Sequence, residues 1–300
     1  IEAENVRYGK KSILVSDQNE LDGHQKVKAV TVKHIFRFDG AHGGQLVEFD
    51  LRKACFNWQN TLTRRKEAYH QRLLDNELED EIVPAEEGID TIHHASMQVD
   101  DTILDAIIYD WYLKNSFVDH ISDANFNGDN FRYCNFHEFG DFCNQPFEVH
   151  LDKNKVTFSR DGGLYFPEKV PTRLEKIYSP SKKGFDFTID LSTEAKGDFK
   201  YVLEHNFHFA DYDTIMVNSE ALTENGKIEQ VSVLEIYDGQ LKQKINIVLD
   251  QPCDIYYFQL KTLSQSEHGF DLSVQGISFA MVIPFNNALS IKGSLEVMNV

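Results

Sequence analysis

The chain has 300 residues, enough for one large domain or two smaller ones with a substantial buried core. Its hydrophobic content of 41% and charged content of 26% are ordinary for a globular protein, and its formal net charge is −18. This charge repels phosphate backbones and anionic lipids, which argues against nucleic-acid and membrane partners and leaves neutral partners open. No apolar run approaches the roughly 20 residues of a membrane helix, and no signal segment is recognised. The first residue is Ile1 instead of Met, so a trimmed chain, a fragment and a processed chain all remain open.

The N-terminal part of the sequence alternates β-prone runs with turn residues. Ser12 to Val15 and Lys26 to Phe38 are the first such runs. Both faces of the second run are partly apolar, which predicts a single strand that is covered on both sides. His42 to Gly44 indicates a turn, and Gln45 to Asp50 is expected to be the partner strand.

The few helical signals lie in the middle of the chain. Asn60 to Leu74 predicts a short surface helix, and we expect Arg64 and Arg65 in it to hold loop carboxylates. Residues 75–90 (DNELEDEIVPAEEGID) are rich in acidic side chains and predict a solvated excursion, to which we assign no function. Residues 91–145 are expected to form a loop-rich insertion with one or two helical turns, or a pair of loops, near Ile103 to Trp111.

One short pattern in this insertion is compatible with calcium. The first half of a calcium loop is matched by four oxygen-bearing residues: Asp123, Asn125, Asn127 and Asp129. The second half does not match, because Cys134 stands at position twelve, where such loops require a bidentate glutamate. An Asn/Gly turn is the competing interpretation. Calcium is therefore the one cofactor considered, and the favoured expectation is no cofactor.

The four cysteines are too few and too scattered for a disulfide scaffold. We expect them to be reduced thiols, as in a cytoplasmic protein. Cys134, His137 and Cys143 lie close together in sequence, but they lack a fourth ligand and match no common structural zinc pattern. Buried thiols are the preferred interpretation.

From Phe147 onward, strands follow one another with almost no helix between them. Alternating or β-prone residues mark the segments Phe147–Leu151, Lys155–Ser159, Phe185–Leu191 and Ile245–Leu249. Turn signals recur at residues 161–163, 179–181, 225–226 and 238–239. These features predict an all-β fold, a large antiparallel two-sheet sandwich with few short helices, formed by a single domain over residues 1–300.

The stretch Thr262 to Gly276 (TLSQSEHGFDLSVQG) mixes apolar strand residues with many polar groups. Asp254 to Leu260 before it and Ser273 to Ile283 after it have strand-like compositions, so the polar segment is expected to join two sheet strands. Ser264 to His268 crowd before Gly269, a residue that can take positive φ at a turn. A solvated loop and a tightly hydrogen-bonded site or corner are both compatible with this pattern.

The same stretch resembles a known family. Its pattern T-x-S-x-S-E-x-G-F…Q-G resembles the end of the C-terminal domain of the α-amylases and 4-α-glucanotransferases of glycoside hydrolase family 57. Gly43 to Asp50 (GGQLVEFD), followed by Asn60 to His70 (NTLTRRKEAYH), resembles a second block. A third, weaker block has the same order: Ile92-His93, Tyr109-Asp110, Ser116-Phe117, Asp119-His120 and Glu138 to Phe142. The resemblance covers nearly the whole chain and implies a β-supersandwich like that of galactose mutarotase.

The resemblance also implies a function. In that family the catalytic carboxylates lie in a separate N-terminal (β/α) barrel, and this chain has no alternating βα pattern of that kind. The chain is therefore expected to be an accessory, non-catalytic domain, or a stand-alone relative, that packs against a catalytic barrel and contacts an α-glucan or another neutral carbohydrate. No catalytic residue is assigned under this interpretation.

Two alternatives stay open. A mutarotase-like epimerase would use His93 as acid and Glu267 as base across the anomeric centre of a sugar, with His94 or His205 as replacements. However, His94 follows His93 where the family carries an aspartate, which removes a partner carboxylate. The second alternative is a carbohydrate-binding or purely structural module, in which Trp58 and Trp111 would supply stacking platforms.

These interpretations together give six candidate carbohydrate-binding residues: His93, Arg132, Glu267, Gln275, Trp58 and Trp111. We expect Glu267 to be held by hydrogen-bond donors, because a buried carboxylate without partners would cost several kcal/mol. His93, Arg132 or Gln275 would then lie near it across a concave sheet face. Between a structural corner and a sugar site, the structural corner is favoured.

Overall fold

The computed structural model describes residues 13–17, 23–75, 101–266 and 269–300. Within this part of the chain, strands account for 58% of residues and helices for 8%, which confirms the predicted antiparallel all-β fold. The first sheet has five strands in the order β1-β2-β3-β4-β5. They are β1 (Ile13–Asp17), β2 (Lys26–Val30), β3 (His34–Asp39), β4 (Gln45–Leu51) and β5 (Phe56–Asn57).

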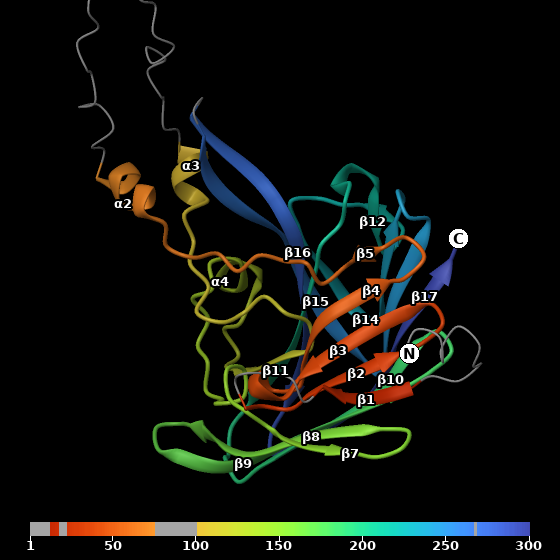
Figure 1. Cartoon of the computed structure of the whole chain (residues 1–300). Helices are drawn as coiled ribbons and strands as arrows, with labels where there is room; N and C mark the ends of the chain where they lie inside the picture. Colours follow the sequence, from red (N-terminus) through yellow and green to blue (C-terminus); the bar gives the residue numbers. More distant parts are fainter. Residues whose placement is uncertain (1–12, 18–22, 76–100, 267–268) are drawn as a thin grey trace, which may run out of the picture.

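The second sheet has twelve strands. Nine of them follow the order β13-β12-β14-β15-β17-β10-β9-β8-β7, and β16, β11 and β6 branch from β15. Their bounds are β6 (Val118–Ser122), β7 (Glu148–Leu151), β8 (Val156–Tyr165), β9 (Lys169–Pro180), β10 (Gly184–Thr193), β11 (Phe199–Phe207), β12 (Ile215–Val217), β13 (Glu220–Ala221), β14 (Asn225–Asp238), β15 (Gln243–Ser266), β16 (Gly269–Phe285) and β17 (Ala288–Asn299). The branch at β15 lets one strand serve two arms of the sheet (Figure 1).

The two sheets pack face to face through aromatic side chains. Phe36 of β3 meets Phe185 of β10 with ring centroids 5.0 Å apart, and Phe38 stacks on Tyr178 of β9 at 4.3 Å. All four rings are fully or almost fully buried, so they exclude water between the sheets. This apolar cluster continues along β11, β15, β16 and β17 and forms the main core.

A second, smaller core covers the opposite face of β6, β11 and β16. The segment between residues 105 and 145 lies on this face and contributes Tyr112, Phe131 and Phe136 to it. Strand β11 (FKYVLEHNF) is consequently buried on both faces along almost its whole length. This position explains why β11 lacks a clean alternation of apolar and polar residues.

Three short α-helices are found in the described residues: α2 (Ala68–Leu74), α3 (Asp101–Asp105) and α4 (Gly128–Arg132). Helices α2 and α3 lie beside the hairpin of β15 and β16, which projects beyond the rest of its sheet (Figure 1). Tyr69 of α2 donates a hydrogen bond to the carbonyl of Leu263, at 2.7 Å, and connects helix and hairpin. None of these helices is long and apolar enough to cross a membrane.

Two local predictions in the N-terminal half were wrong. Lys26–Phe38 forms two strands, β2 and β3, instead of one, because the Thr31 hydroxyl accepts hydrogen bonds from the amides of Lys33 and His34 and closes a turn. The helix expected over Asn60–Leu74 is confined to Ala68–Leu74. Its N-terminus is fixed at Glu67, which forms a capping box with His70.

The C-terminal half followed the predicted hairpins more closely. Strands β7 and β8 pair around residues 152–155. The turn signals at residues 179–181 and 238–239 overlap the last residues of β9 and β14, so these two turns begin slightly later than predicted. The turn predicted at residues 161–163 was wrong, because β8 continues to Tyr165 in register with β9. The one predicted at residues 225–226 was also wrong, since Asn225 begins β14.

Thr262 to Gly276 does join two strands of a sheet. Strands β15 and β16 stay paired from Asp254 with Val282 as far as Ser266 with Gly269, so most of the polar segment is itself strand. The register shifts once, after Leu260, and Gln275 is the extra residue opposite this shift. Residues 267 and 268 lie outside the described residues.

Candidate functional site

A buried group of charged side chains lies under the segment 105–145, on the face of β6 and β11 that this segment covers. Glu204 of β11 is its centre and is completely buried. Its carboxylate accepts hydrogen bonds from Nζ of Lys114 at 3.0 Å, from the Tyr112 hydroxyl at 2.5 Å and from the Asn206 amide at 2.8 Å. Its fourth partner is the His120 ring, at 3.1 Å. Every oxygen of this buried carboxylate is therefore satisfied.

His120 of β6 lies between two carboxylates. Its Nδ1 is 2.7 Å from Glu138 and its Nε2 is 3.1 Å from Glu204. Burial opposes a charged imidazole, but the hydrogen bonds to Glu138 and Glu204 outweigh burial and raise the pKa of His120 to about 9. Burial alone would raise the pKa of Glu204, but the charge of Lys114 and the hydrogen bond from His120 lower it to about 2.

We call the set formed by Tyr112, Lys114, His120, Glu138 and Glu204 the polar network. The side chains of Lys114, His120 and Glu204 have no exposed surface, and only Glu138 is slightly exposed. The network joins the segment 105–145 to the sheet through buried charged contacts.

A second buried ion pair lies on the other face of β6. Nζ of Lys176 is 2.6 Å from Asp119 and also donates to the carbonyl of Phe117, while the Tyr201 hydroxyl donates to Asp119 at 2.6 Å. His205 follows Glu204 on β11, so its side chain lies on the opposite face of the strand, in the main core. Among the described residues, neither ring nitrogen of His205 has a hydrogen-bond partner, and burial lowers its pKa to about 3. His205 is thus a neutral core residue.

A groove opens on the surface next to the polar network. It has a volume of about 270 Å³ and is lined by Arg64, Asp105, Ala106, Ile108, Arg132, Glu224, Asn225, Gln259, Lys261 and Leu272. Arg64 connects the groove to the network: its Nη2 is 2.6 Å from Asp110, which in turn is 3.6 Å from Nζ of Lys114. The expectation that Arg64 holds a loop carboxylate is confirmed by this pair.

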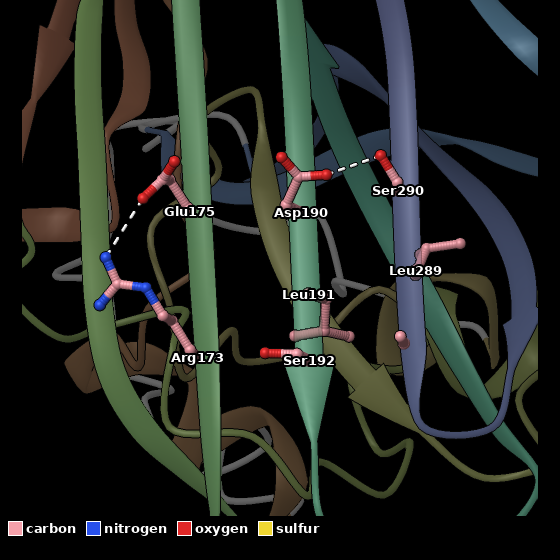
Figure 2. Close-up of a pocket in the computed structure, with 8 residues that line it drawn as sticks. Arg173, Glu175, Asp190, Leu191, Ser192, Leu289 and Ser290 are labelled. Carbon is pink, nitrogen blue, oxygen red and sulfur yellow. Dashed lines mark hydrogen bonds and ion pairs between the residues drawn. The ribbon is translucent and has the colours of Figure 1, made fainter.

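A second hollow, of about 410 Å³, lies over strands β9, β10 and β17 (Figure 2). Its polar side chains are paired with one another: Arg173 binds Glu175 at 3.1 Å, and Ser290 donates to Asp190 at 2.6 Å. None of the sequence-predicted site residues lines it, whereas Arg132 lines the groove. The groove is therefore the better candidate for a carbohydrate site.

The candidate residues from the sequence have different outcomes. Arg132 lines the groove together with Leu272 of the Thr262–Gly276 stretch, and its predicted position near Glu267 stays a prediction. Gln275 is half-buried, and its carbonyl lies 3.3 Å from the His208 ring. Trp111 is 45% exposed and packs its ring edge against Tyr112. Carbohydrate contact by Trp111 and Gln275 stays a prediction.

The prediction that Trp58 is a stacking platform for a sugar was wrong. Trp58 is completely buried in the main core, and its indole nitrogen donates a hydrogen bond to Asp238 at 3.1 Å. No face of its ring is available to a sugar, so it is not a stacking platform. His93 and Glu267, which include the proposed acid and base, lie outside the described residues.

The predicted calcium loop coincides with the start of α4. The Asn127 side chain accepts hydrogen bonds from the amides of Asp129 and Asn130 and caps the helix, while Asp123 accepts from the amide of Asn125. These interactions fit the Asn/Gly turn, and the calcium site stays a prediction. All four cysteines carry free thiols, and only Cys55 is exposed. His137 is exposed, whereas Cys134 and Cys143 are buried.

A family model described as "Alpha-amylase/4-alpha-glucanotransferase, C-terminal" matches residues 18–295. The chain belongs to this family. Among individual relatives, the 4-alpha-glucanotransferase of Thermococcus litoralis is 30% identical over 270 residues, which are 90% of this chain and 39% of that protein. An alpha-amylase of Pyrococcus abyssi is 26% identical over 273 residues, or 91% of this chain and 39% of that protein. The chain thus spans about two fifths of the length of these relatives.

Solved structures agree with the family assignment. The crystal structure of the 4-alpha-glucanotransferase from Thermococcus litoralis matches with a TM-score of 0.77 and 25% identity, covering 99% of this chain and 40% of that one. A galactose mutarotase-like protein from Clostridium acetobutylicum matches with a TM-score of 0.52 and 9% identity, covering 97% of this chain and 100% of that one. The second match shows the fold alone, and it confirms the mutarotase-like sandwich expected for a member of the α-amylase/4-α-glucanotransferase C-terminal family.

The sequence did not reveal the polar network. Lys114 and Glu204 are 90 positions apart, and His120 and Glu204 are 84 apart, so no local spacing connects them. One signal was present: Glu204 interrupts the apolar strand Phe199–Phe207, where a lone carboxylate buried without partners would be costly. It predicts a buried partner without saying which residue supplies it.

Proposed function

We propose that this chain is the accessory domain of an enzyme that acts on α-glucans, and that it supports a catalytic domain and contacts the glucan. The observation that carries the proposal is the coverage of the family match. It extends over residues 18–295 of this chain but accounts for only about two fifths of each relative. The relatives' names are those of glucan-acting enzymes, and the remaining length of each is available for a catalytic region.

The fold supports a non-catalytic role. All strand pairs among the described residues are antiparallel, as in a sandwich, and the parallel βα repeats of a barrel are not found in this part of the chain. The central charged groups of the polar network, Lys114, His120 and Glu204, are buried and paired with one another. A rigid sandwich with a covered second face suits a supporting domain, and the open groove next to it suits a contact with neutral carbohydrate.

The proposal also concerns the cellular location of the protein. Three of the four cysteines are buried free thiols and the fourth, Cys55, is an exposed free thiol. Free thiols persist in reducing compartments, so the proposed location is the cytoplasm.

The mass of the native polypeptide in its source cells tests the proposal. An antibody raised against this chain is expected to detect a polypeptide far above 34.6 kDa, and mass spectrometry of that band should yield peptides from a catalytic region. A native polypeptide of 34.6 kDa that interconverts the anomers of a free sugar would contradict the proposal and favour the epimerase alternative.

A further inference from the structure

We propose that the groove beside the polar network binds a short segment of a neutral α-glucan, with Arg64, Asn225 and Gln259 as its hydrogen-bonding residues. This inference rests on the proposed function and assigns the glucan contact to one place. It depends on an Arg64 donor that no protein group holds, on two unpaired amides, on the charge balance of the groove and on its apolar wall.

The unused donor belongs to Arg64. Its side chain is about 95% buried, with 5% relative exposure for the residue, and lines the groove. Nε and Nη2 bind Asp110, and Nη2 also donates to the carbonyl of Arg132. The remaining nitrogen, Nη1, makes no hydrogen bond within the part of the chain that the structure describes. A guanidinium fixed by an ion pair, with one nitrogen that no protein group holds at the wall of a groove, is a place for a ligand oxygen.

Two amide side chains flank this donor. Asn225 begins β14 and Gln259 lies on β15, and both line the groove. In the described residues neither side-chain amide has a hydrogen-bond partner, whereas the Gln259 backbone amide donates to the carbonyl of Glu224 and holds the two strands together. An amide presents one acceptor and two donors. This combination suits the hydroxyl groups of a sugar, which both donate and accept.

The charges of the groove favour a neutral ligand. Each of its three cations is paired with its own carboxylate: Arg64 with Asp110 at 2.6 Å, Arg132 with Asp105 at 2.7 Å and Lys261 with Glu224 at 2.8 Å. The groove therefore has no excess charge, although the chain carries a formal net charge of −18. A phosphate or carboxylate ligand would have to compete with carboxylates already in place.

The wall and size of the groove fit a sugar ring. Ala106, Ile108 and Leu272 provide apolar surface for the C–H face of a ring, and the exposed ring of Tyr133 lies next to Arg132 at the rim. The volume of about 270 Å³ is just below the range of roughly 300–1,000 Å³ typical of small-molecule pockets. The groove thus suits a short segment of a chain and not a long buried one.

Isothermal titration calorimetry with maltotriose tests the groove. We expect the double variant Asn225→Ala/Gln259→Ala to bind at least about tenfold more weakly than the unchanged protein, because two hydrogen-bonding groups are lost. Both amides are at or near the surface, so the melting temperature should not change. Gln251→Ala is the matched control: it removes a half-buried amide from the same strand, outside the groove, and should leave the affinity unchanged. Cellotriose, with β-linked glucose, is the control ligand and should bind more weakly.

Two results would overturn this inference: no heat of binding at millimolar maltotriose, or equal affinity for the double variant and the unchanged protein. Neither result would contradict the assignment as an accessory domain, which depends on the mass and composition of the native polypeptide, although an absence of binding would contradict the glucan contact included in that proposal. Conversely, a native polypeptide of 34.6 kDa would contradict that proposal and leave the calorimetric result standing.

Discussion

Replacing Glu204 by glutamine tests whether the polar network holds the insertion on the sheet. Glu204→Gln keeps the side-chain volume, so no cavity forms, but it removes the charge that Lys114 and His120 face. Lys114 would remain buried, with Asp110 at 3.6 Å as its remaining carboxylate. Breaking a buried ion pair in this way costs about 3–5 kcal/mol, because the other charge is left uncompensated. We expect a loss of this size in the free energy of unfolding.

Urea unfolding followed by tryptophan fluorescence measures this loss, and Trp111 reports on it directly because its ring contacts Tyr112 and His120. Glu175→Gln is the matched control: Glu175 pairs with Arg173 on the surface, where such a pair contributes about 1 kcal/mol or less. The double variant Lys114→Met/Glu204→Leu should recover much of the lost stability. A loss below about 1 kcal/mol for Glu204→Gln would show that the network is not what anchors the insertion.

Three further predictions concern pH and packing. The folded pKa of His120, about 9, lies above its ordinary value of 6.5, so the stabilising contribution of His120 is complete below pH 6.5 and is lost as the pH rises through 9. Melting temperatures should therefore fall between pH 6.5 and 9, and they should fall less for His120→Gln. The folded pKa of His205, about 3, lies below 6.5, so unfolding takes up a proton in acid and stability should decrease below pH 6.5. In a pH series of thermal melts, His205→Leu should reduce this decrease. Gly162→Ala would place a methyl group against the Asp141 carboxylate and the Phe142 ring, and calorimetry should show a loss of roughly 1–3 kcal/mol; an unchanged melting temperature would mean that this loop moves away freely.

The fold was predictable because its signals are local. Strand alternation and turn residues placed the hairpin of β7 and β8 and the end of β9 near residues 179–181, and they predicted the antiparallel class. The same local reasoning failed at Lys26–Phe38, where the hydroxyl of Thr31 closes a turn inside an apparently continuous strand. The glycines at residues 162 and 163 indicated a turn but instead allow a loop to approach a strand closely.

The candidate site was less predictable because it depends on contacts between distant residues. Arg132 was chosen from the sequence and does line the groove. Asn225 was interpreted only as a turn residue, and Gln259 gave no signal, since a single amide in a strand carries no pattern of its own. Trp58 was misassigned for the opposite reason: a tryptophan suits both a core and a sugar platform, and only the packing around Asp238 decides between them.

Incubation of the purified chain with maltooligosaccharides, followed by chromatography of the products, tests the central claim most directly. The account predicts neither hydrolysis nor transfer of glucose units, because the chain is proposed to support a catalytic domain and not to contain one. Conversion of maltooligosaccharides that survives repurification and is lost in Glu267→Gln would contradict it, and would show that this chain is an enzyme by itself.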